Sequence, residues 1–260
     1  MVQVLKSETP VSMLRHIAEV ATRRLIWKLH LPRRYGRLPI YVSPANALKF
    51  LKPGDGKFDP FLLWLADNFV KSNSVVWDIG ANGGVFSMLA SSKAKAVVAF
   101  EPDPFNISLI RRTIGANPQS AIQLVPKALS EAAGETVLNI PSRSRSVSSI
   151  GEIPMGYMSG GLRESMRVEM TTADACLDNY PAPTFIKCDI EGAEAMMLRG
   201  AQRLLTEARP TVCMEVRLGT REEVANQFTR HGYRMFTADD AMTPLSSLTD
   251  IEEVVAVPQD

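Results

Sequence analysis

The sequence predicts an α/β domain in which a mostly parallel sheet carries helices on both faces. From residue 75 onward, short apolar or β-branched runs alternate with helical stretches, and the first run ends in a glycine-rich turn that opens a helix. Such alternation places successive strands side by side with the helices packed over them. The composition agrees, because 260 residues with 45% hydrophobic and 22% charged side chains can bury a sizeable core.

Residues 1–57 are predicted to form a helical extension and lead-in to a domain at 58–260. Residues 11–30 place apolar side chains at helical spacing with basic ones on other faces, which predicts an amphipathic helix. With the arginines that follow, residues 11–34 offer a basic segment for peripheral membrane contact, although such helices more often cover a core. Prolines and glycines punctuate residues 32–56, so we expect turns and a short hairpin near 38–42.

The remaining elements follow from hydrophobic periodicity. We expect strands at 75–79, 96–101, 121–125, 184–189 and 211–216, and helices at 58–71, 85–92, 104–116, 194–207 and 222–231. Residues 135–140 and 166–171 are predicted to be extended on either side of a Ser-, Gly- and Met-rich loop at 141–165. A loop of that length is usually functional or mobile. Its arginines and hydroxyls at 142–149 suit a sugar or phosphate-bearing acceptor, and a solvated loop is an equal alternative.

Charge and cysteine content exclude several classes of protein. Lys and Arg number 29 against 28 Asp and Glu, and a net charge of +1 argues against a dedicated nucleic-acid binder. The three cysteines and three histidines are scattered, so we expect no disulfide framework and no Cys or His metal site. Cys188 and Cys213 are expected to lie buried inside strands. Without a bilayer-spanning apolar run or a signal peptide, the expected location is the cytoplasm.

The sharpest motif follows the strand at 75–79. That strand carries Asp78 near its end, and a glycine-rich turn lets a ligand approach the backbone beside free helical N–H groups. A dinucleotide fingerprint needs glycines where the chain has Asn82 and Val85, and no P-loop lysine follows. A carboxylate here suits a positive amino or sulfonium group, as in S-adenosylmethionine. The turn consists of Gly80, Ala81, Asn82, Gly83 and Gly84.

A second acidic residue, Glu101, follows the next strand about 20 positions beyond the glycine turn. At this spacing an acidic side chain binds the ribose hydroxyls of a cofactor in α/β proteins. Glu101 is therefore a candidate ribose ligand.

These motifs resemble those of the FkbM-type S-adenosylmethionine-dependent methyltransferases. The resemblance covers residues 58–236 and rests on the runs at 78–87, 100–102, 128–134 and 187–194. It implies a Rossmann-like methyltransferase fold with a seven-stranded, mostly parallel sheet whose last strand, at 251–257, is antiparallel. It also implies that residues 78–84 hold the methionine part of the cofactor, with Gly84 replacing the family's apolar β-branched residue. The ribose and adenine sides are then assigned to Glu101, Pro102, Ala128, Leu129 and Ser130.

Acidic side chains near the expected methyl group supply candidate catalytic residues. Asp189 and Glu191 lie at a strand end and the turn after it, and either suits the base that removes the acceptor's proton. Asp189 is assigned to the cofactor site as well. Glu215 ends the next strand and is expected to face Asp189. Such a pair can bind Mg²⁺, but with only two ligands in view we predict no metal site.

The sequence thus predicts transfer of a methyl group from S-adenosylmethionine to a hydroxyl oxygen of a small molecule. The resemblance suggests a sugar or a polyketide-like natural product as the acceptor. An alternative enzyme is an NAD-dependent oxidoreductase, which shares the βαβ start and the acidic residue after the second strand. A non-enzymatic alternative is a catalytically idle, cofactor-binding module that docks on a membrane surface through residues 11–34.

Overall fold

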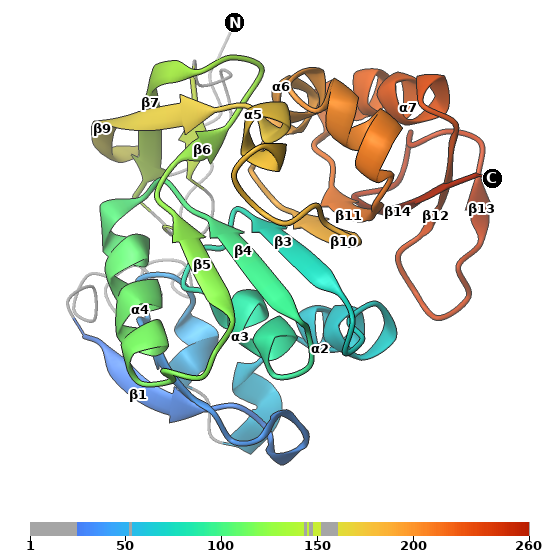
Figure 1. Cartoon of the computed structure of the whole chain (residues 1–260). Helices are drawn as coiled ribbons and strands as arrows, with labels where there is room; N and C mark the ends of the chain where they lie inside the picture. Colours follow the sequence, from blue (N-terminus) through green and yellow to red (C-terminus); the bar gives the residue numbers. More distant parts are fainter. Residues whose placement is uncertain (1–24, 52–53, 143–144, 146–147, 152–160, 260) are drawn as a thin grey trace, which may run out of the picture.

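An eight-stranded sheet forms the centre of the protein in a computed structural model that describes residues 25–51, 54–142, 145, 148–151 and 161–259. The strand order is β13-β12-β14-β11-β10-β3-β4-β5 (Figure 1). Neighbours from β5 to β11 are parallel, whereas β14 is antiparallel to both β11 and β12. The predicted methyltransferase-like α/β fold is therefore confirmed, with one short edge strand, β13, beyond the seven expected. The bounds are β3 (Val75–Ile79), β4 (Ala96–Phe100), β5 (Ile122–Val125), β10 (Phe185–Cys188), β11 (Thr211–Glu215), β12 (Tyr233–Thr237), β13 (Pro244–Leu245) and β14 (Glu253–Pro258).

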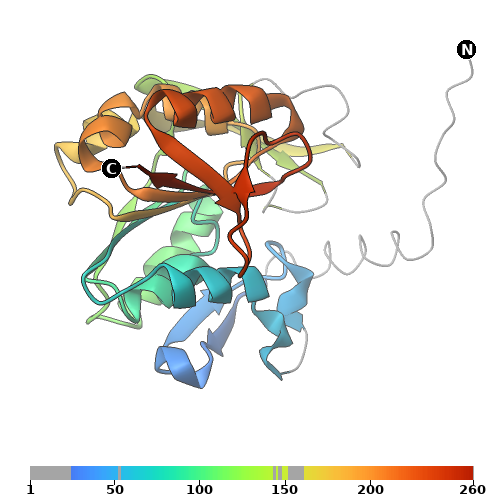
Figure 2. The same ribbon diagram turned by 90° about the vertical axis from the view of Figure 1, so that its right-hand side faces the viewer.

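Helices cover both faces of this sheet, as Figure 2 shows from the side. Alternate strand residues point to opposite faces, so Trp77 and Ile186 join a core with α5, α6 and α7. Their neighbours Val76 and Phe185 join a second core with α2, α3 and α4. The helices are α2 (Pro60–Asn68), α3 (Val85–Ser91), α4 (Pro104–Gly115), α5 (Ala173–Leu177), α6 (Glu194–Arg199) and α7 (Arg221–Arg230), with short 3₁₀ turns η1 (Arg33–Tyr35), η2 (Leu48–Leu51), η3 (Gly54–Lys57) and η6 (Leu218–Thr220).

The expected N-terminal helix is wrong where the structure describes it. Trp27–His30 forms strand β1, which pairs antiparallel with β2 (Pro39–Val42), so the segment expected near 38–42 does form a hairpin, but its partner is the stretch predicted to be helical. Trp27 and Leu29 are partly buried while the residues after each are exposed, which is the alternation of a strand. At residues 27–30, the two-residue burial period of a strand therefore replaces the predicted helical spacing. The rest of the predicted helix, residues 11–24, lies outside the described part.

The helix predicted at 194–207 is also wrong, because the structure divides it. Helix α6 ends at Arg199, and a π-helical turn, η5 (Leu204–Ala208), follows. The carboxylate of Asp174 accepts the N–H groups of Arg203 and Leu204 at 3.0 and 2.9 Å. This long-range cap starts a new helical segment, and hydrophobic periodicity does not reveal it.

A smaller sheet with the order β6-β9-β7-β8 lies beside β5 (Figure 1). It confirms the two extended segments predicted around the long loop, although the second begins at Leu162 rather than at 166. Its core consists of Leu138, Ile140 and Val168. The strands are β6 (Ala128–Leu129), β7 (Gly134–Pro141), β8 (Ser149–Ile150) and β9 (Leu162–Thr171).

Two further expectations can be compared with the structure. Cys188 and Cys213 are free and buried in β10 and β11, as predicted. Among the residues described, no helix has both the length and the apolar character required to cross a membrane.

We predict that the segment before α2 belongs to the cooperative core. Ile40 in β2 is 1% exposed and contacts the core that α3 and α4 share. Ile40→Ala is expected to lower the free energy of unfolding by about 2–5 kcal/mol through lost burial and a residual cavity. Val137→Ala, at a strand position that is 42% exposed, is the control and should change it by less than about 0.5 kcal/mol. Urea denaturation measures both, and equal effects would contradict the assignment.

Candidate active site

The turn after β3 crosses the carboxyl edge of the sheet in close contact with β10. Gly80 adopts φ +74°, and its N–H donates to the carbonyl of Phe100 at 3.0 Å. A Cβ on Gly80 would lie 2.0 Å from the carbonyl oxygen of Asp189, so this position requires glycine. Gly84, the departure from the family pattern, has φ +77° and lies against Ile110. A branched residue would be strained there, so the backbone conformation explains the glycine.

Lys187 joins the first and fourth strands of the predicted cofactor edge. It is 7% exposed, and its Nζ donates to the carbonyl of Gly80 at 3.0 Å. The same Nζ lies 3.6 Å from Asp78 and 3.4 Å from Asp189. Burial lowers the pKa of Lys187, but the charges of Asp189 and Asp78 outweigh it and raise that pKa above its ordinary value. The ammonium therefore stays charged and holds the glycine turn against β10.

Asp78 itself lies beneath this turn rather than on its surface. It is fully buried, and its carboxylate accepts a hydrogen bond from the hydroxyl of Ser87. Burial raises the pKa of Asp78, while the charge of Lys187 and the hydrogen bond from Ser87 act in the opposite direction. Asp78 is therefore placed to stabilise the charge of Lys187 rather than to contact a ligand.

Glu101 points back toward the glycine turn from the end of β4. One carboxylate oxygen accepts the N–H of Asn82 at 2.7 Å, and the other accepts the N–H of Asp103 at 2.8 Å. The carboxylate keeps a lone pair for a ligand hydroxyl. Burial raises the pKa of Glu101 to about 8 despite these hydrogen bonds.

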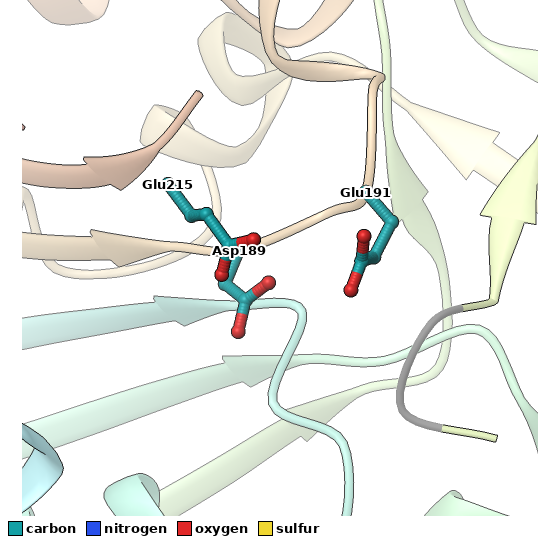
Figure 3. A group of neighbouring side chains, drawn as sticks. All are labelled: Asp189, Glu191 and Glu215. Atoms are coloured by element: carbon teal, nitrogen blue, oxygen red, sulfur yellow. The ribbon is translucent and has the colours of Figure 1, made fainter. Parts of the chain in front are cut away.

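Three carboxylates converge beyond the ends of β10 and β11 (Figure 3). Single oxygens of Asp189, Glu191 and Glu215 all lie within 4.8 Å of one another, which confirms that Asp189 and Glu215 face each other. Arg217 forms ion pairs with Glu191 and, at 2.8 Å, with Glu215. Burial raises the pKa of Glu191 to about 7 against the opposing effect of Arg217. Burial and the charge of Asp189 raise the pKa of Glu215 to about 7 as well.

The three carboxylates can be examined as ligands for Mg²⁺. Their oxygens would satisfy the ion's chemical preference. The sequence pattern indicates only two of the three as possible ligands. However, the guanidinium of Arg217 already supplies the positive charge between Glu191 and Glu215. The set therefore fits a carboxylate–arginine cluster rather than a resident cation.

Two cavities meet at this cluster. The smaller one runs along the ends of β3 and β4 and past β6, and the larger one, about 360 Å³, is lined on one side by residues from 42–50 and 58–62. Both are lined by Asn82, Asp189 and Glu191. A molecule in either cavity would therefore contact these three side chains.

The structure brings most of the predicted site residues to these cavities. The smaller cavity is lined by Gly80, Glu101, Pro102, Ala128 and Leu129, and the larger one by Ala81, Gly83 and Glu215, besides the three shared side chains. Three predicted residues line neither cavity, namely Asp78, Gly84 and Ser130. Ser130 is buried, and its N–H donates to Thr171 in the small sheet.

Several polar residues at the site were not predicted as site residues. Lys187 carried a usable signal, because a lysine inside an otherwise apolar strand must find buried partners. Arg217 follows β11 without any local motif. Arg145 belongs to the loop for which an acceptor-binding or a solvated role was expected; it is 8% exposed, lines the smaller cavity and forms ion pairs with Asp103 and Glu164.

The raised pKa values predict a pH-dependent stability. Burial and Asp189 raise the pKa of Glu215 to about 7, so the folded state binds more protons than the unfolded chain from about pH 4.5 to 7. The free energy of unfolding should therefore fall as pH rises through this window. Glu215→Gln should reduce that fall by up to about 1 kcal/mol per pH unit. Chemical denaturation across this range measures the slope, with Glu222→Gln, an exposed site on α7, as control. An unchanged slope in Glu215→Gln would contradict the assignment.

Comparison with known proteins identifies relatives of this chain. A protein of Haloferax volcanii named hexuronic acid methyltransferase AglP is 28% identical over 154 residues, which are 57% of this chain and 58% of that protein. An uncharacterised protein of Methanocaldococcus jannaschii is 34% identical over 59 residues, 23% of each chain. The chain thus spans less than two thirds of the length of the curated relatives it matches.

A solved structure and a family model complete the comparison. The crystal structure of methyltransferase FkbM from Methylobacillus flagellatus aligns with a TM-score of 0.45 at 20% identity, covering 72% of this chain and 44% of that one. The family described as the methyltransferase FkbM domain matches residues 78–235. Because this match covers more than half of the sequence, the chain belongs to the FkbM methyltransferase family.

Proposed function

We propose that the protein transfers the methyl group of S-adenosylmethionine to a hydroxyl oxygen of a small-molecule or sugar acceptor. The observation that carries the proposal is the common wall of the two cavities, where Asp189 and Glu191 face both. A cofactor in the smaller cavity would present its methyl group to an acceptor in the larger one at this wall. The family membership and the name of the Haloferax relative support methyl transfer to a sugar.

The residues of the smaller cavity fit S-adenosylmethionine. Glu101 offers a carboxylate lone pair for a ribose hydroxyl, and Ala128 and Leu129 provide an apolar surface for the adenine. Asp189 and Glu191 place negative charge beside the position of the sulfonium. When bound, the cofactor supplies a methyl group that its positive sulfur has already activated.

The protein's own groups align the acceptor and take its proton. Asp189 has the most exposed side chain of the three carboxylates, 36% against 26% for Glu215 and 7% for Glu191. We assign Asp189 as the base that accepts the hydroxyl proton as the oxygen bonds to the methyl carbon. Lys187 orients this carboxylate through its ion pair. Glu215, with a pKa raised to about 7 by burial and by Asp189, can share the proton within the cluster.

The alternatives predict different ligands. An NAD-dependent oxidoreductase would bind NAD, and the family membership favours methyl transfer over that chemistry. A catalytically idle membrane module would dock through residues 11–34, of which 11–24 lie outside the described part. Flotation with anionic vesicles, with and without those residues, tests the docking.

We predict that the protein binds S-adenosylhomocysteine, the product form of the cofactor, with micromolar affinity and does not bind NAD. Glu101→Ala should weaken this binding at least tenfold because the ribose loses its carboxylate partner. The exposed Glu135→Ala in β7 is the control and should leave the affinity unchanged. Calorimetric titration measures all three proteins, and binding of NAD alone by the wild type would overturn the proposed function.

We also predict that Asp189→Asn lowers turnover by about 10²–10⁴-fold, because the amide cannot take the hydroxyl proton. Affinity for S-adenosylhomocysteine should change less than threefold. Glu222→Gln removes an exposed carboxylate on α7 that lines neither cavity, and it should keep most of the turnover. Rates are measured as S-adenosylhomocysteine release with a glycoside acceptor found by screening. A normal rate in Asp189→Asn would remove this residue from the catalytic assignment.

A further inference from the structure

We propose that Asn46 is a positioning residue that holds the glycine turn in its cofactor-binding conformation. Asn46 lies on the segment 43–50, outside the residues that match the family. The inference rests on the proposed function and deepens it, because it names a part of the cofactor site that comes from the acceptor side of the molecule.

The side chain of Asn46 joins two parts of the site. Asn46 is 4% exposed, and its Nδ2 donates both to the Oδ1 of Asn82 and, at 2.8 Å, to the Oδ1 of Asn106. Asn82 belongs to the glycine turn and adopts φ +52°, a conformation that carries a steric cost even for asparagine. The hydrogen bond from Asn46 offsets this cost and fixes where the turn's N–H groups point.

Both acceptors of this amide also reach Glu101. The N–H of Asn82 donates to one oxygen of Glu101 at 2.7 Å, and the side chain of Asn106 hydrogen-bonds the same carboxylate. One amide from the N-terminal segment thus fixes two partners of the candidate ribose ligand. Only a group with two N–H donors can serve both oxygens, so neither aspartate nor an apolar residue can replace it.

Asn46 is itself held in place from two sides. Its N–H donates to the carbonyl of Ser43 at 3.0 Å within a tight turn. In the same turn, the carbonyl of Ala45 accepts the N–H of Arg145 at 3.2 Å. The guanidinium of Arg145 pairs with Asp103, whose N–H donates to Glu101. The segment 43–50 is therefore also linked to Glu101 through Arg145 and Asp103.

The position of Asn46 also links the two cavities. Asn46 lines the larger cavity, and its partner Asn82 lines both. An acceptor that fills the larger cavity would therefore contact the amide that orders the cofactor turn.

Asn46→Asp provides a near-isosteric test because it removes both N–H donors. Asn117 offers a matched control, since it is 1% exposed and its Nδ2 also donates to two carbonyl oxygens, those of Pro39 and Thr113. It lines neither cavity. Asn46→Asp is expected to weaken binding of S-adenosylhomocysteine at least tenfold in calorimetric titration. Asn117→Asp should lower the melting temperature by a similar amount and leave the affinity within twofold of wild type.

The outcomes separate this inference from the proposed function. Wild-type affinity in Asn46→Asp, or an equal loss in both variants, would overturn the positioning role while the proposed function stands. A wild-type protein that does not bind S-adenosylhomocysteine would overturn the proposed function and this inference with it. If Asn46→Asp does not fold, Asn46→Ala beside Asn117→Ala gives the same comparison, with thermal unfolding confirming that each variant is folded at the titration temperature.

Discussion

The buried ammonium of Lys187 is the interaction on which the arrangement of the site depends. A charge removed from water is stable only with close partners, and here they are the carbonyl of Gly80 and the carboxylates of Asp78 and Asp189. These partners come from the turn after β3, the interior of β3 and the end of β10. One cation thus links the glycine turn after β3 to the carboxylate of Asp189 at the end of β10.

Much of the fold could be predicted because runs of hydrophobic residues in the sequence correspond to buried strands and helices in the structure. The five parallel strands and α3, α4 and α7 lie within a residue or two of their expected limits, since both faces of the sheet are covered and the strands are almost wholly apolar. The strand-end residues Glu101, Asp189 and Glu215 were predictable for a related reason. Parallel strands bring their carboxyl ends to one edge of the sheet, so acidic residues there must come together.

The remainder depended on contacts that local patterns do not encode. Trp27–His30 is a strand because β2 pairs with it, and α6 ends early because Asp174 caps a separate turn. The position of Asp78 in the sequence resembles that of a ligand-binding carboxylate. In the structure, its carboxylate pairs with Lys187 and accepts a hydrogen bond from Ser87 inside the sheet. Arg217 and Arg145 pair with carboxylates far away in the sequence. These two long-range pairs could not be detected without the tertiary structure.

One wall of the larger cavity has a consequence for how this chain is built. That wall is formed by residues from 42–50 and 58–62, whereas the family match begins at residue 78. Under the proposed function, the stretch that the family shares carries the reaction chemistry, and a neighbouring stretch lines the space for the second substrate. Because Asn46 in that neighbouring stretch also hydrogen-bonds Asn82 of the glycine turn, a substitution there can act on cofactor binding as well as on the fit of the acceptor.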